Sequence, residues 1–522
     1  MITAAGVTVA VFLPSIHNGF VFYDDNLYVT ENPRVLEGLS ETNVRWAFGA
    51  VGYASNWHPL TWISLMADVS LAGRGRMSAV MHGHNVLLHA ANAALLVLLL
   101  SLMCRERLDG IWLLGIALLW SLHPLRTEVV AWVSERKEAL SVFWMLFSLI
   151  FHCDGGKGLR DSLRVSLSLL CFVFALLAKP VAVTLPAVIL AWDVLYERRI
   201  RWGRIIAFSI LSFAACWLTI CAQTDGLTSG AKQPACSLVN AILGAPIVYL
   251  RQTLWPVGLS IVYEVKHSID WPVVLPGTLL VLLMGVFAVL WLRVRRRSWL
   301  DLTVFAIAWL YVGLVPMLGF VKVGSMEHSD RYTYWIGCGA AACLAIGLSR
   351  CHGSLDALKG WMERVDGRTY KRDGLRRCGI AGLCLCVIAL AGGTRHYLPR
   401  WRDSLSLLAA DVPKCWSPEF AQQMADEFMR LVPPRVADAE QILRTCAKES
   451  PNPLSYRNLS RFLIDHTDSV VGMRGDVPLH YEAEWLLKTV LAKYPEEKEA
   501  HELLGRIECA RQRLKELGHV QR

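Results

Sequence analysis

The sequence predicts an all-α, polytopic membrane protein with about eleven transmembrane helices and a helical domain after the last of them. Composition leads to this fold class. Of the 522 residues, 54% are hydrophobic and only 19% are charged, and the mean hydropathy is +0.38. A soluble globular chain of this length does not need so much apolar surface, so we expect a multi-pass integral membrane protein.

The net charge and the cysteines argue against two other classes of protein. The charge of +9 does not indicate nucleic-acid binding, because most of the surplus basic residues fall in short loops between apolar runs, where they set membrane topology. The fifteen cysteines include no C-x-x-C pair, and many of them lie inside apolar segments. We interpret them as small buried hydrophobic residues rather than as metal ligands.

Apolar runs of spanning length recur along residues 1–394. The predicted spans lie near 2–19, 80–103, 110–131, 139–153, 163–178, 180–196, 204–222, 272–292, 300–320, 332–349 and 378–394. The first run has no basic stretch ahead of it and no small-residue cleavage site, so we expect it to remain as the first span.

The charges of the loops predict which side of the membrane each loop faces. Basic loops alternate with neutral or acidic ones, and by the positive-inside rule the basic loops face the cytoplasm. The loops predicted to lie outside are 21–79, 123–138, 224–271 and 321–331. Residues 238–255 are apolar enough to span, but a further span would place the basic cluster at 293–297 outside. We therefore expect this segment to lie along the outer face or to re-enter it.

The tail from about residue 395 is charged and has no run of spanning length, and eleven spans place it outside the cytoplasm. Amphipathic stretches that end in proline recur at 404–413, 438–451 and 481–495, and helix-like stretches follow at 456–465 and 500–514. Such helix pairs predict a short, degenerate solenoid of the tetratricopeptide type, and the alternative is an irregular helical cap. The chain is thus divided into a transmembrane domain, 1–394, whose first external loop is 21–79, and an extracytoplasmic helical domain, 395–522.

Two adjacent carboxylates, Asp24 and Asp25, follow the first predicted span and are the strongest candidates for chemistry. Acids at the edge of the hydrocarbon layer are costly to keep there and usually serve ion or substrate chemistry. Two carboxylates this close repel each other when both are ionised, which raises the pKa of one of them unless a cation intervenes. Such a carboxylate can accept a proton from a hydroxyl nucleophile. The alternative is that they are solvated loop acids that help to orient the first span. A divalent metal ion is the one cofactor that the sequence leaves open.

A second group of polar residues follows the third predicted span. The step from His123 to Pro124 should end or kink that helix, because proline disfavours helical geometry in the residue before it. The stretch that follows would then lie on the outer surface, where arginine and lysine could bind a lipid phosphate. As snorkelling side chains they would need no such function. The members of this group are His123, Arg126, Glu128, Arg136 and Lys137.

Two isolated cations also lie on the predicted outer side. Lys179 has almost no loop around it, and Arg331 follows Asp330 before the tenth predicted span. The positive-inside rule would place such cations inside, so binding of an anion explains them better. We therefore expect Lys179, Arg331 and Arg136 to converge with the acidic pair on one face. His58, which precedes a proline, is a further candidate for binding the acceptor.

Several short motifs in order along the chain resemble a known family. They are GFVFYDD at 19–25, WHPLT at 57–61, HNVLLH at 84–89, HP at 123–124, VSERKE at 133–138, AKP at 178–180, LWP at 254–256, DRYTY at 330–334 and WRDS at 401–404. The chain resembles bacterial relatives of the transmembrane and tetratricopeptide-repeat O-mannosyltransferases, within the GT-C glycosyltransferase superfamily. The resemblance runs from the first span to about residue 415, and the tail matches more loosely.

The resemblance implies an enzyme of the bacterial inner membrane with a GT-C-like fold. Such an enzyme takes a sugar from a polyprenyl-phosphate carrier in the lipid and passes it to a hydroxyl on a protein or glycan acceptor outside the cytoplasm. Mannose is the candidate sugar. Carried onto this chain, Asp24 would be the base and Asp25 its partner. Arg136, Lys137, Lys179 and Arg331 would then bind the phosphate, whose neutralised charge makes it a good leaving group.

Two other functions compete with the transferase. One is a non-enzymatic membrane scaffold whose helical tail binds partner proteins, and the other is a transporter of lipid-linked sugars. A scaffold does not need cations beside an acidic pair. A transporter should show internal duplication or charges along a mid-membrane path, and the two halves of the membrane region show no repeat.

Overall fold

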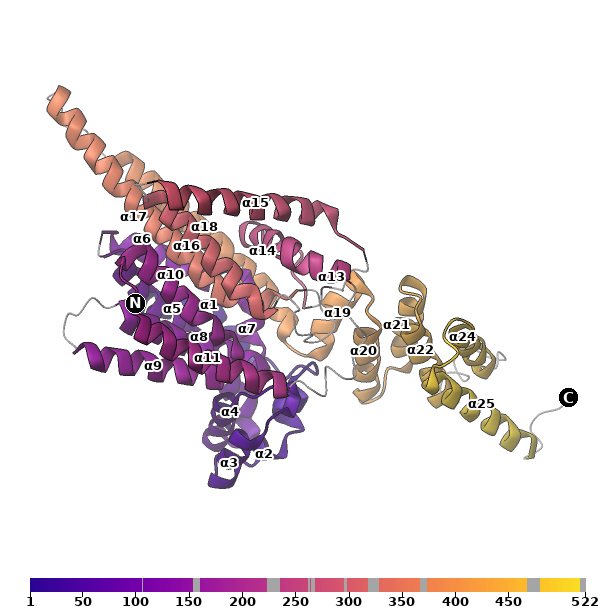
Figure 1. The fold of residues 1–522 in the computed structure, drawn as a ribbon. Helices are drawn as coiled ribbons and strands as arrows, with labels where there is room; N and C mark the ends of the chain where they lie inside the picture. Colours follow the sequence, from indigo (N-terminus) through magenta and orange to yellow (C-terminus); the bar gives the residue numbers. More distant parts are fainter. Residues whose placement is uncertain are drawn as a thin grey trace. The chain divides into compact units, whose positions relative to one another are not determined.

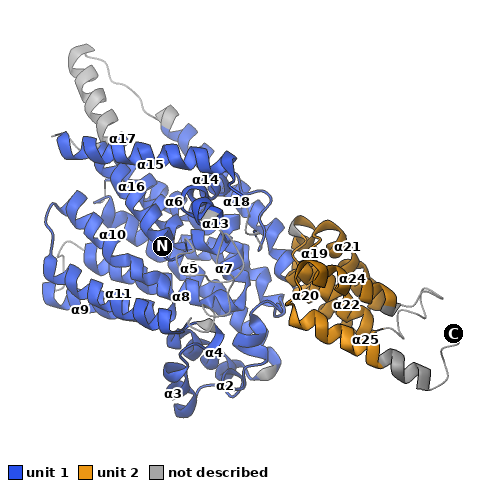
Figure 2. Ribbon diagram, turned by 45° about the vertical axis from the view of Figure 1, so that its right-hand side comes forward, with its two compact units in different colours: residues 1–402 blue, residues 403–522 orange. Residues whose placement is uncertain are grey.

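The computed structural model is helical, and its described part contains no β-strand. It describes the chain except residues 106, 154–159, 223–234, 262, 264–267, 295–297, 318–327, 367–372, 467–478 and 517–522. The chain forms two compact units, residues 1–402 and residues 403–522 (Figure 2). The predicted all-α class is therefore confirmed.

Within the described residues, eight helical segments are long and apolar enough to cross a membrane, and a bent pair can be counted as a ninth. This is consistent with a multi-pass integral membrane protein. The eight are Met77–Met103 (α5), Asp161–Ala178 (α9), Pro180–Glu197 (η7, α10 and η8), Trp202–Ala222 (α11), Trp271–Arg293 (α15), Trp299–Met317 (within α16, Ser298–Leu314, and η10), Asp330–Cys351 (η11 and the first part of α17, Thr333–Asp366) and Arg376–Trp401 (within α18, Asp373–Tyr397, and η12).

The bent pair is the third predicted span. It consists of α6 (Gly110–Ser121) and the short helices of Pro124–Ala131, η5 and α7, at an angle of 58°. The bend lies at the His123–Pro124 step, where the backbone of His123 is extended, as a residue before proline prefers. After this bend α7 packs against α5, and the chain leads into α8 (Arg136–Cys153).

The helices of the first unit pack around α5 and α8. α5 contacts α1 (Ile2–Phe12), α6 and α8, and α8 runs along α9 (Figure 1). Large apolar side chains such as Phe172, Trp309 and Trp335 are buried in the shared core. Other helices present exposed apolar residues on their outer faces, as helices in contact with lipid do; Phe213 on α11 is 80% exposed.

Residues 235–254 form three consecutive helical segments without a break between them and are not among the candidate spans. The run consists of α13 (Ala235–Val239), η9 (Asn240–Gly244) and α14 (Ala245–Leu254). It packs against α15 where Gly277 allows a close approach, since a Cβ there would lie 1.8 Å from the carbonyl oxygen of Leu243. Residues 238–254 are thus helical throughout, with a π-helical turn at Asn240–Gly244, but they do not meet the criteria for a candidate span.

The segment between α1 and α5 carries short helices with an apolar cluster of their own. These are α2 (Pro33–Leu36), α3 (Glu41–Gly49), η3 (Tyr53–Ser55), α4 (Pro59–Ala72) and η4 (Arg74–Arg76). Tyr28, Trp62 and Leu65 are fully buried in the cluster. Asn32 caps α2 by accepting from the backbone N–H groups of the first turn, at 3.1 and 3.2 Å. This packing gives the polar residues near it a fixed support.

The described residues of the second unit form three successive helix pairs. The pairs are α19 (Ser404–Cys415) with α20 (Pro418–Arg430), α21 (Val436–Glu449) with α22 (Pro453–Asp465), and α24 (Leu479–Lys493) with α25 (Lys498–Glu516). Each helix packs on the next one in the chain. Small and apolar residues form their buried faces, and Ala421, Ala439, Leu463 and Ala483 are fully buried.

Candidate active site

Asp25 is a buried anchor of the first loop. Its Oδ1 accepts a hydrogen bond from the backbone N–H of Ser134 at 2.9 Å and another from the hydroxyl of Ser134, and its Oδ2 accepts one from the N–H of Val21 at 3.0 Å. Burial raises the pKa of Asp25 to about 6, although these hydrogen bonds oppose the shift. Oδ1 therefore holds the start of the loop against Ser134, and Oδ2 closes a local turn with Val21.

Asp24, in contrast, keeps a side chain that is 37% exposed. Its Oδ2 lies 4.0 Å from Nζ of Lys137. Desolvation raises the pKa of Asp24, and the charges of Lys137 and Arg331 oppose the rise. Of the two adjacent acids, Asp24 is thus the one that a ligand can reach.

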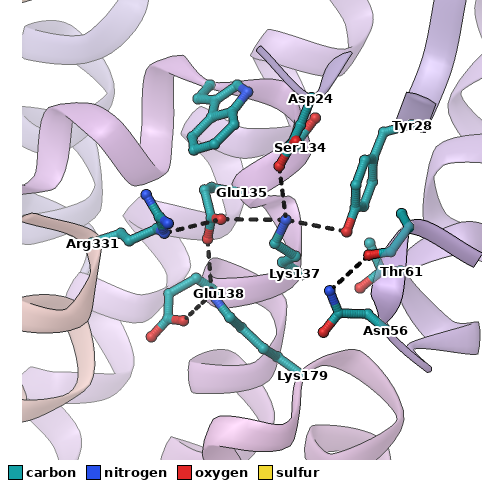
Figure 3. A network of polar contacts seen from close by, with 12 residues as sticks. Asp24, Tyr28, Asn56, Thr61, Ser134, Glu135, Lys137, Glu138, Lys179 and Arg331 are labelled. Carbon is teal, nitrogen blue, oxygen red and sulfur yellow. Dashed lines mark hydrogen bonds and ion pairs between the residues drawn. The ribbon is translucent and has the colours of Figure 1, made fainter. Parts of the chain in front are cut away.

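The buried carboxylate of Glu135 joins its neighbour Lys137 to two cations from distant parts of the chain, Lys179 and Arg331 (Figure 3). Its oxygens lie 2.9 Å from Nζ of Lys179, 3.3 Å from Nζ of Lys137 and 3.5 Å from Nε of Arg331. Burial alone would raise the pKa of Glu135, but these three cations lower it to about 2. Glu135 therefore stays ionised and holds the cations together.

Two further carboxylates bind the outer members of this network. Glu138 lies 2.8 Å from Nζ of Lys179. Glu128 accepts from the guanidinium of Arg331 at 2.6 Å and from the backbone N–H of the same residue at 2.9 Å. Lys179 follows the end of α9, and Arg331 lies in η11 (Asp330–Tyr332), so each cation is positioned by a helix end.

Aromatic rings cover the cations on one side. Nζ of Lys137 donates to the hydroxyl of Tyr28 at 3.2 Å and lies 4.3 Å from the centre of that ring. Trp132 stands over both Lys137 and Arg331, at 5.7 and 5.5 Å. We call Asp24, Glu135, Lys137, Lys179 and Arg331 the charged centre. Ionic groups gathered in a partly dry site are costly, and such sites are enriched in functional residues.

His58 lies beside the charged centre. Its ring stacks on that of Tyr28, with centroids 5.4 Å apart. Burial and the charges of Lys137 and Lys179 hold the pKa of His58 well below its usual value, so the imidazole is neutral. In the described part of the chain its Nε2 has no hydrogen-bond partner.

Arg136, expected to lie beside Lys179 and Arg331, belongs to a different ion pair. It is fully buried, and its NH2 lies 2.7 Å from Oδ2 of Asp68 on α4. Successive residues of a helix point about 100° apart, so the start of α8 directs Arg136 away from the face that Glu135 occupies. The expected convergence therefore includes Asp24, Lys179 and Arg331, and Lys137 takes the place that we assigned to Arg136.

The other predicted site residues make contacts elsewhere in the first unit. Arg126 donates to the backbone oxygen and the hydroxyl of Thr333, at 2.8 and 2.7 Å. Nε2 of His123 lies 3.0 Å from the backbone oxygen of Thr253. The carboxylate of Asp330 accepts from the hydroxyl of Tyr263 at 2.8 Å.

Glu135 and Tyr28 are absent from the site that the sequence predicts. Glu135 belongs to the noted run VSERKE, but nothing in the run distinguishes it from its charged neighbours. As for metals, no three His, Cys, Asp or Glu side chains among the described residues are arranged to hold an ion.

Comparison with known proteins gives one distant relationship. Over 215 residues the chain is 26% identical to "Protein O-mannosyl-transferase TMTC2" of Homo sapiens, and it has the same identity to the protein of that name from Mus musculus. The match covers 39% of this chain and spans 25% of the length of each relative. No family model and no solved structure matches the chain. The chain is thus a distant homologue of the TMTC2 O-mannosyltransferases.

Proposed function

We propose that the protein is a membrane glycosyltransferase of the GT-C type that moves a sugar from a polyprenyl-phosphate carrier to a hydroxyl acceptor. The observation that carries the proposal is the charged centre itself. Three cations gather on Glu135 next to an accessible carboxylate, Asp24. A phosphate-linked donor needs both kinds of group, and the distant relatives are named as O-mannosyltransferases.

Asp24 acts as the base in this proposal. Its carboxylate accepts the proton of the acceptor hydroxyl while the hydroxyl oxygen forms a bond to the anomeric carbon of the sugar. The bond between that carbon and the carrier phosphate breaks, and its electron pair leaves with the phosphate. A raised pKa makes Asp24 a stronger base.

Lys137, Lys179 and Arg331 stabilise the leaving phosphate. They are already assembled on Glu135, so charge that develops on the phosphate meets donors that need no rearrangement. Glu138 and Glu128 keep Lys179 and Arg331 in place from the far side. Phosphate oxygens can share the remaining donors of these cations through charge-assisted hydrogen bonds.

The remaining predicted residues support this centre. Asp25 fixes the backbone next to Asp24, and Arg136 fixes the first turn of α8 through Asp68. The neutral, buried ring of His58 stacks on Tyr28 and so supports the side chain that binds Lys137. Asp330 binds Tyr263 next to Arg331, and Arg126 holds Thr333 at the start of α17. His123 binds the end of α14 through Thr253.

We also infer the finer architecture. Adding α1 with η1 (Ile2–His17) and α8 to the nine candidate spans gives the eleven that the sequence predicts. The loop that carries Asp24 and the second unit then lie outside the cytoplasm, which in a bacterium means beyond the inner membrane. The three helix pairs of that unit form the degenerate tetratricopeptide-like domain, a surface for a protein acceptor.

The test uses the full chain in liposomes with polyprenyl phosphates that carry radiolabelled mannose or another sugar. A transferase moves the label to a protein or peptide acceptor and releases polyprenyl phosphate, and preference for the mannosyl donor would identify the sugar. Movement of intact lipid-linked sugar across the bilayer without release indicates the transporter instead. Absence of both activities with every donor indicates the scaffold.

A further inference from the structure

A groove of about 740 Å³ lies between α6, α14, α17 and α18. Its lining is almost entirely apolar, and it includes none of the residues of the charged centre. Leu254 and Trp255, each 72% exposed, form part of its rim. Because α6, α17 and α18 belong to candidate membrane-spanning segments, this rim is placed to meet lipid chains.

The polar end of the groove is formed by Arg126, whose guanidinium has no carboxylate within ion-pair distance in the described part of the chain. The residue is only 3% exposed. Both of its terminal nitrogens donate to Thr333, and its Nε has no hydrogen-bond partner. The rings of Trp120 and Tyr334 lie 5.7 and 5.4 Å away. A buried cation that lacks a counter-charge is costly, so an anionic partner would stabilise it.

Small residues line the groove beside Arg126, where a Cβ on Gly337 would lie 3.4 Å from NH1 of Arg126. Gly337, Ala340 and Ala341 come from α17, and Ala389 and Gly393 from α18. On α17 the lining runs from Gly337 to Leu344, roughly 10 Å of helix at 1.5 Å per residue. That depth suits part of an acyl chain, and the volume lies in the range of ordinary ligand sites.

We propose that this groove binds an anionic glycerophospholipid, with an acyl chain along the groove and the phosphate at Arg126. The charge of Arg126 selects an anionic headgroup, and the exposed apolar rim selects a lipid over a soluble anion. The site is separate from that of the sugar carrier, because the phosphate of the carrier is assigned to residues that do not line the groove. The proposal therefore holds whether or not the protein transfers sugar.

The test measures lipid binding to the purified full-length protein in detergent by native mass spectrometry and thermal unfolding. The probes are dioleoyl phosphatidylglycerol, which is anionic, and dioleoyl phosphatidylcholine, which is zwitterionic. Phosphatidylglycerol should bind more tightly and raise the thermal midpoint. Arg126→Gln should weaken that binding by roughly tenfold or more, as expected when a hydrogen bond to a charged group is lost.

A second variant keeps the test decisive if Arg126→Gln fails to fold. Ala389 is exposed on α18, so Ala389→Phe fills the groove without burying a new group in the core. It should abolish the preference for phosphatidylglycerol, whereas Arg395→Gln, an exposed arginine on the same helix outside the groove, should leave it unchanged. Equal binding of both lipids, or unchanged binding in Ala389→Phe, would overturn the proposal. A third result would also overturn it: polyprenyl phosphate competes with phosphatidylglycerol in the wild type but not in Ala389→Phe. The groove would then belong to the carrier.

Discussion

Lys179 donates a hydrogen bond to Glu135 at 2.9 Å, although 44 positions of the chain separate the two residues. The contact joins the end of α9 to the segment just before α8. Because Glu135 also binds Lys137 and Arg331, one carboxylate fixes the spacing of all three cations. The arrangement of the charged centre therefore depends more on Glu135 than on Asp24, the carboxylate that a ligand can reach.

Glu135→Gln should destabilise the protein strongly. The change leaves three partly buried cations with less counter-charge, and breaking a buried ionic contact in this way costs about 3–5 kcal/mol. The free energy of unfolding in mixed detergent micelles measures the effect. Glu41→Gln is the matched control, because Glu41 pairs with Arg45 where both side chains are about four-fifths exposed. Equal stability of the two variants would contradict the central position of Glu135.

Lys179→Ala and Arg331→Ala should each weaken binding of polyprenyl phosphate by about 1.5–3 kcal/mol, the range for hydrogen bonds to charged groups. Equilibrium binding to the detergent-solubilised protein measures this loss. Arg105→Ala serves as the control, since its side chain is 58% exposed and pairs with Glu197 away from the charged centre. If all three variants bind as the wild type does, the phosphate site lies elsewhere.

Stability should depend on pH through Asp25. The folded protein holds a proton on Asp25 up to a pKa of about 6, whereas the pKa of the unfolded chain is near 3.8. The resulting stabilisation is complete below the unfolded pKa and is lost as the pH rises through 6, a change of about 3 kcal/mol for a shift of this size. The thermal midpoint of the wild type should therefore be higher at pH 5 than at pH 7.5, and this gain should exceed the gain measured for Asp25→Asn. Parallel pH profiles would show that Asp25 does not titrate in this range.

Hydropathy predicted the helices well because it is a local property of the sequence. α11 and α15 begin and end close to the predicted 204–222 and 272–292. The third predicted span, 110–131, bends at Pro124, as the sequence indicated, so it became two helices rather than one. Two other predicted spans, 2–19 and 139–153, correspond to helices outside the eight or nine candidates, one being short and the other beginning with three charged residues.

The charged centre was harder to predict because long-range packing decides which way each charge points. Asp24 and Asp25 look equivalent in the sequence, yet Asp25 is buried by Ser134, which lies 109 positions away. Glu135 and Arg136 are adjacent, and only the turn of the helix and the position of Asp68 send them to different ion pairs. No local pattern carries this information.

The topology predicts which loops a membrane-impermeant thiol reagent can reach. Single cysteines at Arg45, in the first loop, and at Arg199, between η8 and α11, test it in a background without native cysteines. Both residues are exposed in the structure. Only the cysteine at position 45 should react in intact cells, and the one at 199 should react after permeabilisation. The reverse pattern would place the charged centre on the cytoplasmic side and contradict the proposed orientation.

Asp24→Asn, compared with the wild type in both carrier binding and sugar transfer, tests the account most directly. The substitution keeps the shape of the side chain and removes the base. We therefore expect transfer to fall to background while the variant still folds and still binds polyprenyl phosphate. Sugar transfer at the wild-type rate by Asp24→Asn would show that the accessible carboxylate of the charged centre takes no part in the reaction.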